Sequence, residues 1–123
     1  MISIIIPNYN KSQFVAETIN SVKKQTYDNW EAIIIDDCSS DNSLDIIEKL
    51  IANDNKFRLK VNFSNKGANY SRNLGIKEAR GKFIIFLDSD DILSKDCLKN
   101  RIEFFRDSPN IDFAIFCMGS FNE

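Results

Sequence analysis

The chain has 123 residues, 43% of them hydrophobic and 28% charged, a composition typical of one globular domain. Its 16 basic and 18 acidic side chains give a net charge of -2, so the positive excess that a nucleic acid partner would require is missing. No apolar run approaches the roughly 20 residues of a membrane span, and the first residues do not resemble a signal peptide. We therefore expect a cytoplasmic location, or in the full-length protein the cytoplasmic face of a membrane.

The predicted elements alternate between strand and helix. Apolar runs without polar alternation predict strands covered on both faces at residues 3–6, 32–35, 83–87 and 113–117. Residues 57–63 alternate apolar and polar side chains, which predicts an edge strand. The sequence thus predicts a mostly parallel sheet.

Apolar residues at helical spacing lie between these strands. Three such sets are Val15, Ile19 and Val22; Leu44, Ile47 and Ile51; and Leu98, Ile102 and Phe105. Asn10 and Ser12 are expected to cap the first helix, and Ser94 with Asp96 to start the last one. A further crossover helix is expected from about residue 67 to 80, where small residues such as Gly75 would permit close packing. The pattern predicts an α/β fold, a Rossmann-like doubly wound sheet in three α/β/α layers.

Each predicted strand before the last ends in a polar stretch, at residues 7–10, 36–41, 64–67 and 88–91. The carboxyl ends of parallel strands share one edge of a sheet, where ligands bind at the switch point in strand order. Neither GxGxxG after the first strand nor GxxxxGK[ST] is present, so these phosphate-binding loops lack support. We expect one polar crevice that neutralises phosphates by another means.

The stretch FIIFLDSDD places three carboxylates, Asp88, Asp90 and Asp91, at the end of a strand. In an extended segment Asp88 and Asp90 point to the same side and could face one cation. The chain has no histidine, so a metal must take oxygen ligands, which magnesium and manganese prefer. Acidic turns also follow many strands without a metal, so this motif alone does not decide between the two interpretations.

Other polar residues of the predicted crevice could bind a nucleotide. One residue of the pair Asp36 and Asp37 is expected to be structural, and the other could accept a hydrogen bond from the ring N–H of a base such as uracil. Tyr9 could stack on that base or pack half-buried. Arg72 could reach a phosphate or the Asp88 loop, and Lys66 is a second cation nearby.

The segments SIIIPNYN, IIIDDCSSDNS, NKGANYSRNLGIKEARG and FIIFLDSDD together resemble the family 2 glycosyltransferases of the GT-A fold over nearly the whole chain. The resemblance implies an inverting hexosyltransferase of bacterial cell-envelope polysaccharide biosynthesis. Such an enzyme uses a nucleotide diphosphate sugar, usually a UDP-sugar, with manganese or magnesium on the diphosphate. Its acceptor would be a saccharide, a lipid-linked molecule or a protein.

The expected donor site combines both lines of reasoning. Its donor-binding residues are Pro7, Tyr9, Asp37, Lys66, Arg72, Asp88 and Ser89. By the resemblance, Pro7 and Tyr9 hold the base and Asp37 binds the uracil N–H. The expected metal ligands are Asp90 and Asp88, with Asp88 on the ribose side and Asp91 as an alternative.

The family's general base is expected beyond Glu123, together with the acceptor-binding part. Residues 1–123 are therefore expected to be the part of a GT-A domain that binds the nucleotide diphosphate sugar, inactive or weakly active alone. One alternative is a nucleotide-binding module without catalytic activity. Another is a receiver-like, magnesium-binding signalling domain, although its acidic pair would follow the first strand rather than the second.

Overall fold

A computed structural model describes residues 1–114. It contains four parallel strands in the order β3-β2-β1-β4. They are β1 (Ile2–Asn8), β2 (Trp30–Asp36), β3 (Phe57–Val61) and β4 (Phe83–Phe86). The chain runs from β1 outward to β3 and then crosses back to place β4 on the other side of β1. The strand order therefore reverses between β1 and β4, the kind of switch point where α/β sheets bind ligands.

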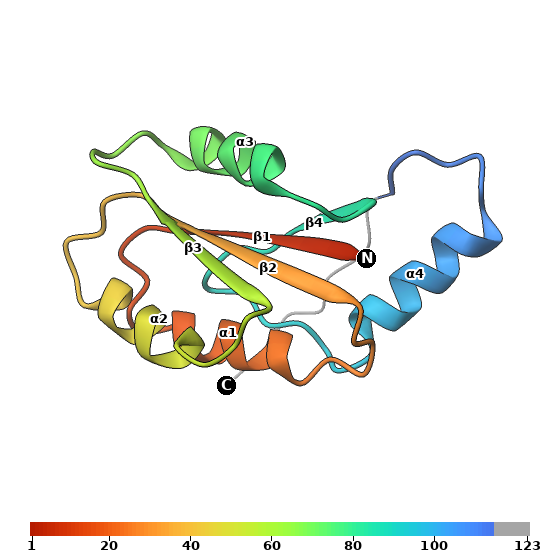
Figure 1. Cartoon of the computed structure of the whole chain (residues 1–123), viewed down its shortest axis with the longest axis horizontal. Helices are drawn as coiled ribbons and strands as arrows, with labels where there is room; N and C mark the ends of the chain where they lie inside the picture. The colour runs from red at the N-terminus through yellow and green to blue at the C-terminus, as the bar shows by residue number, and fades with distance from the viewer. Residues whose placement is uncertain (115–123) are drawn as a thin grey trace.

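Helices cover both faces of this sheet. α1 (Val15–Lys23) and α2 (Ser43–Ile51) lie on one face, and α3 (Ala68–Glu78) lies on the other (Figure 1). α4 (Cys97–Asp107) lies beyond the end of the sheet at which the strands begin, and its Leu98 joins the core on the side of α1. The predicted three-layer, doubly wound α/β fold is confirmed.

The two central strands explain why their sequences are uninterrupted apolar runs. Every residue of β2 and all but Pro7 of β1 are buried, because helices pack on both faces. On one face Ile4, Ile6 and Ile34 pack with α1 and α2 in the main core. On the other face α3 comes so close that a Cβ added to Gly75 would lie 2.4 Å from Ile5 Cγ2. The expected close packing at Gly75 is therefore confirmed.

A buried ionic network ties the end of α3 to the sheet. Glu31 accepts hydrogen bonds from Ser3 Oγ at 2.7 Å, from the Arg80 N–H at 2.7 Å and from Arg58 Nη2 at 2.9 Å. Burial works against the charge of Glu31, but these hydrogen bonds outweigh burial and lower the pKa of the carboxyl below its usual value. The network holds the turn that leads into β4.

The edges of the sheet differ in part from the prediction. β3 is the expected edge strand, although it ends at Val61. β4 was expected inside the sheet, but among the described strands it pairs only with β1, and Ile84 and Phe86 are exposed. Of the strand predicted at 113–117, residues 115–117 lie outside the described part of the chain, and residues 113 and 114 are not in a strand.

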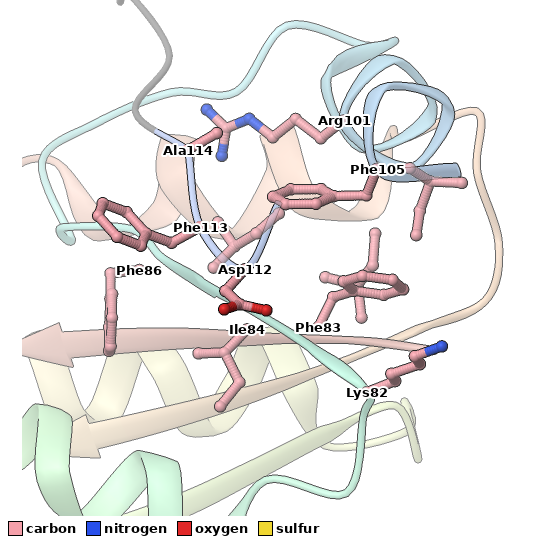
Figure 2. A pocket seen from close by; sticks show the side chains of 12 residues that line it. Lys82, Phe83, Ile84, Phe86, Arg101, Phe105, Asp112, Phe113 and Ala114 are labelled. Carbon is pink, nitrogen blue, oxygen red and sulfur yellow. The ribbon is translucent and has the colours of Figure 1, made fainter. Parts of the chain in front are cut away.

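A cavity of about 630 Å³ lies beside β4 and α4 (Figure 2). Its walls are mainly apolar and include Phe83, Phe86, Phe105 and Phe113. None of the predicted donor or metal residues lines it. The polar loops of the chain meet elsewhere.

Candidate functional site

A second cavity, of about 290 Å³, opens at the carboxyl ends of the strands on the two sides of the switch point. It is lined by Pro7, Asn8, Tyr9, Lys11, Asp37, Ala68, Ser71, Asp88, Ser89 and Asp90. Six of these were predicted site residues, and they come from the ends of β1, β2 and β4. The loops meet here because parallel strands end at the same edge of the sheet.

The acidic loop after β4 carries a tight cluster of carboxylates. One oxygen from each of Asp88, Asp90 and Asp91 lies within 4.8 Å of the others. Burial and the neighbouring charges of Asp90 and Asp88 raise the pKa of Asp91 above its usual value. Three hard oxygen donors at this spacing, which repel one another, fit a divalent magnesium or manganese ion.

Two cations already pair with this cluster. Arg72 Nη2 lies 3.1 Å from Asp88 Oδ1, and Lys11 Nζ lies 3.3 Å from Asp90 Oδ2. Of the two partners expected for Arg72, the structure therefore shows the acidic loop. Lys11 was missed by sequence reasoning, although it directly follows PNYN at the predicted crevice.

Two buried polar side chains of α1 contact the main chain of the acidic loop that follows β4. Thr18 Oγ1 lies 2.9 Å from the carbonyl oxygen of Ser89 and 2.7 Å from that of Asp91. One turn further along α1, Ser21 Oγ accepts a hydrogen bond from the Leu93 N–H. Sequence reasoning missed both residues, and the signal was a polar stripe on an otherwise apolar helix face.

The two carboxylates at the end of β2 have different partners. Asp36 is structural, because it is buried and accepts hydrogen bonds from Asn8 Nδ2 and from the N–H and Oγ of Ser39. Asn8 Oδ1, also buried, has no hydrogen-bond partner within residues 1–114, which leaves one acceptor beside the cavity.

Asp37 lines the cavity as an ionised acceptor. It accepts hydrogen bonds from Asn62 Nδ2 at 2.9 Å and from the N–H groups of Lys66 at 2.8 Å and Gly67 at 2.9 Å. Burial works against its charge, but these hydrogen bonds outweigh burial and lower the pKa of Asp37. A carboxylate has about four acceptor positions, so three protein bonds leave one for a ligand.

The remaining predicted residues lie around this cavity in different ways. Tyr9 lines it and is 45% exposed, so its ring is accessible. Lys66 touches the site through its main chain, whereas its ammonium lies 6.0 Å from the centre of the Tyr70 ring. The expected capping role of Asn10 is wrong, because its Oδ1 accepts hydrogen bonds from the N–H groups of Ser40 and Asp41 instead.

The other expected caps are also absent. Ser12 makes no cap, because α1 begins after Phe14 without a side-chain cap bond. The last helix begins after Asp96, again without such a bond. Distant loop residues bind the segments before both helices instead. The Ser12 N–H donates to Asp41 Oδ2 at 2.9 Å, and Thr26 Oγ1 donates to Asp96 Oδ1 at 2.7 Å.

Comparison with known families shows to which family this chain belongs. The family model described as "Glycosyl transferase family 2" matches residues 3–122. The chain belongs to this family. The resemblance read from the four sequence segments is thus confirmed, and the receiver-like alternative is wrong.

Individual glycosyltransferases show the same relationship. The putative teichuronic acid biosynthesis glycosyltransferase TuaG of Bacillus subtilis is 38% identical over 85% of this chain and 41% of its own length. The crystal structure of Staphylococcus aureus TarS 1-349 in complex with UDP-GlcNAc has a TM-score of 0.81 and 35% identity, over 86% of this chain and 31% of that one. The chain spans less than half the length of either relative.

A more distant structure supports the fold alone. The mannosyltransferase PcManGT of Pyrobaculum calidifontis, solved with GDP-Man and Mn²⁺, has a TM-score of 0.79 at 19% identity, over 85% of this chain and 32% of that one. Within residues 1–114, no helix is long and apolar enough to cross a membrane.

Proposed function

We propose that this glycosyltransferase chain binds a nucleotide diphosphate sugar, with uridine as the base, as the donor of an inverting sugar transfer. The observation that carries this proposal is the cavity at the switch point, which is lined by Tyr9, by Asp37 and by two members of the acidic cluster, Asp88 and Asp90. TarS, a relative at 35% identity, has been solved with UDP and with UDP-GlcNAc.

The base would lie at the β1 and β2 side of the cavity. Asp37, ionised and with one acceptor position left, would accept the ring N–H of uracil. The exposed ring of Tyr9 would stack on the base, and the main chain at Pro7 would border it. Cytosine carries no N–H at the corresponding ring position, so an ionised Asp37 would favour uridine over cytidine.

The diphosphate would lie at the β4 side of the cavity. Asp90 and Asp88, with Asp91 as an alternative ligand, would hold a manganese or magnesium ion, and Asp88 would also lie near the ribose. When bound, this ion supplies Lewis-acid stabilisation of the charge on the departing nucleotide diphosphate. Arg72 pairs with Asp88, and Ser89 and the main chain of Lys66 would complete the rim around the donor.

Residues 1–123 would be the donor-binding part of the catalytic domain. Sugar transfer also needs a general base for the acceptor hydroxyl, and we place it beyond Glu123 with the acceptor site. These residues alone would bind the donor and transfer its sugar weakly or not at all. The acceptor would be a saccharide, a lipid-linked molecule or a protein.

A calorimetric titration with UDP tests this proposal. We expect UDP to bind the wild type in the presence of Mn²⁺, and to bind at least about tenfold more weakly after Asp90→Ala or without the metal. Lys24→Met, at the exposed residue that directly follows α1, is a control that leaves the cavity intact. The proposal is wrong if UDP does not bind, or if it binds equally well without metal and in Asp90→Ala.

A further inference from the structure

On the basis of the donor site proposed above, we infer that Lys11 is a displaceable cation of this site. It pairs with Asp90 before the divalent ion arrives, and it binds the donor diphosphate once that ion takes the carboxylate. Lys11 would therefore weaken the binding of the metal alone and strengthen the binding of the donor to the metal-loaded site.

The main chain of Lys11 is held firmly at the entry to α1. The preceding Asn10 has a left-handed conformation, with φ of 53°, and its side chain binds the main chain at Ser40 and Asp41. The carbonyl oxygen of Lys11 accepts hydrogen bonds from the N–H groups of Phe14 at 3.0 Å and Val15 at 2.9 Å. The base of the side chain is therefore fixed beside the cavity.

The charged end of Lys11 is held far less firmly. Its ion pair with Asp90 is half-exposed, with 43% and 39% of the two side chains accessible. Ion pairs at such exposure are weak and screened by salt. Arg72 is held at two points. Its Nη2 donates to Asp88 Oδ1, and its Nη1 donates to Asn69 Oδ1 at 3.3 Å. Of the two counterions, Lys11 is the one that can leave easily.

Lys11 and a metal ion compete for the same carboxylate. Lys11 Nζ lies 3.3 Å from Asp90 Oδ2, and Asp90 belongs to the cluster whose oxygens fit a divalent ion. A lysine ammonium is a compact charge on a flexible stem and binds phosphate readily. Because Lys11 also lines the cavity, a released ammonium remains within the space proposed for the diphosphate.

The charge balance of the acidic cluster and its two counterions supports this exchange. Asp88, Asp90 and Asp91 carry three negative charges, and Lys11 and Arg72 compensate two of them. Adding a divalent ion changes the net charge from minus one to plus one. The diphosphate of a nucleotide sugar carries one negative charge on each phosphate, so its binding returns the net charge to minus one. Without Lys11 the loaded site would keep two uncompensated negative charges, so the donor would bind more weakly.

Two affinities measured on the full chain separate these roles. Free Mn²⁺ is followed by electron paramagnetic resonance without nucleotide, and UDP binding is followed by calorimetry at saturating Mn²⁺. For Lys11→Met we expect Mn²⁺ alone to bind about fivefold more tightly and UDP to bind about fivefold more weakly, because the competing cation and the phosphate partner are the same group. Lys11→Arg keeps the charge and should stay near the wild type in both measurements.

Lys24→Met is the matched control, since it removes the same charge from the residue that follows the far end of α1. The inference is overturned if Lys11→Met and Lys24→Met give the same two affinities, or if both affinities change in the same direction. If the wild type binds neither Mn²⁺ nor UDP, the proposed function fails and the role of Lys11 fails with it. If the wild type binds both and Lys11→Met matches the control, only the role of Lys11 fails.

Discussion

Thr18 Oγ1, on α1, lies 2.7 Å from the carbonyl oxygen of Asp91 in the acidic loop. The two residues are 73 positions apart in sequence, and the same hydroxyl also lies 2.9 Å from the carbonyl oxygen of Ser89. Since Thr18 is fully buried, this contact fixes the main chain from which the carboxylates project. α1 thus determines where the acidic cluster is presented to the cavity.

Replacing Thr18 by valine should loosen this loop at nearly constant volume. The two carbonyl oxygens would lose their buried donor, so we expect the free energy of unfolding to fall by about 1–2 kcal/mol and UDP with Mn²⁺ to bind more weakly. Urea unfolding and calorimetry measure the two effects. Thr26→Val, which removes the exposed hydrogen bond to Asp96, is the control and should cost less than about 0.5 kcal/mol. Equal effects of the two substitutions would contradict the anchoring role of Thr18.

Asp91→Asn should separate stability from metal binding. Asp91 lies beside Asp88 and Asp90, so removing its charge relieves like-charge repulsion and should raise the free energy of unfolding by roughly 0.5 kcal/mol without metal. If Asp91 is a metal ligand, the same change weakens Mn²⁺ binding; if it is not, Mn²⁺ affinity changes little. Thermal unfolding with and without Mn²⁺ distinguishes these outcomes. A lower melting temperature without metal would refute the repulsion between these carboxylates.

Replacing Cys38 by glycine should stabilise the protein. It has a left-handed conformation with φ of 59°, a region that costs a residue with a Cβ about 1–2 kcal/mol. Part of the gain is lost to the greater freedom of glycine in the unfolded chain, so Cys38→Gly should raise the free energy of unfolding by up to about 1 kcal/mol. Chemical denaturation measures it.

Asn10→Gly is the matched control for Cys38→Gly. Asn10 has a similar φ of 53°, but its Oδ1 accepts hydrogen bonds from the N–H groups of Ser40 and Asp41. Removing these bonds should lower the free energy of unfolding by about 1–2 kcal/mol. If Cys38→Gly also lowered the free energy of unfolding, backbone strain would not be the deciding effect at Cys38.

Acid should weaken the contacts of Asp41 in a narrow pH range. Burial works against its charge, but hydrogen bonds from Ser43 and from the Ser12 N–H outweigh it and lower the pKa of Asp41 from 3.8 to about 2. A lowered native pKa gives stability that is present above about pH 4 and is lost as the pH falls towards 2. Asp41→Asn should therefore cost roughly 1 kcal/mol at pH 7, after allowance for solvent screening, and clearly less at pH 2.5. Denaturant unfolding of both proteins at the two pH values gives the difference, and a difference independent of pH would refute this assignment.

Much of the fold could be predicted because its signals are local. Ile4 to Ile6 and Ala32 to Ile35 are continuous apolar runs, and only strands covered on both faces bury such runs completely. Pairing those strands in parallel places Pro7, Asp37 and Asp88 at one edge, so the cavity followed from the order of elements. The helix starts were predicted less well, because Asn10 and Asp96 bind distant segments rather than their own helices.

The sequence by itself thus determined the family, the parallel sheet and the loops that form the site, because apolar periodicity and short motifs act through neighbouring residues. Only the tertiary structure decided which charges meet there. Three pairings at the site join segments that are far apart in the sequence: Lys11 with Asp90, Arg72 with Asp88, and Thr18 with the acidic loop. The physical reason is that such distances depend on how the helices and the sheet pack together, and residues far apart along the chain carry no local signal of the distance between them.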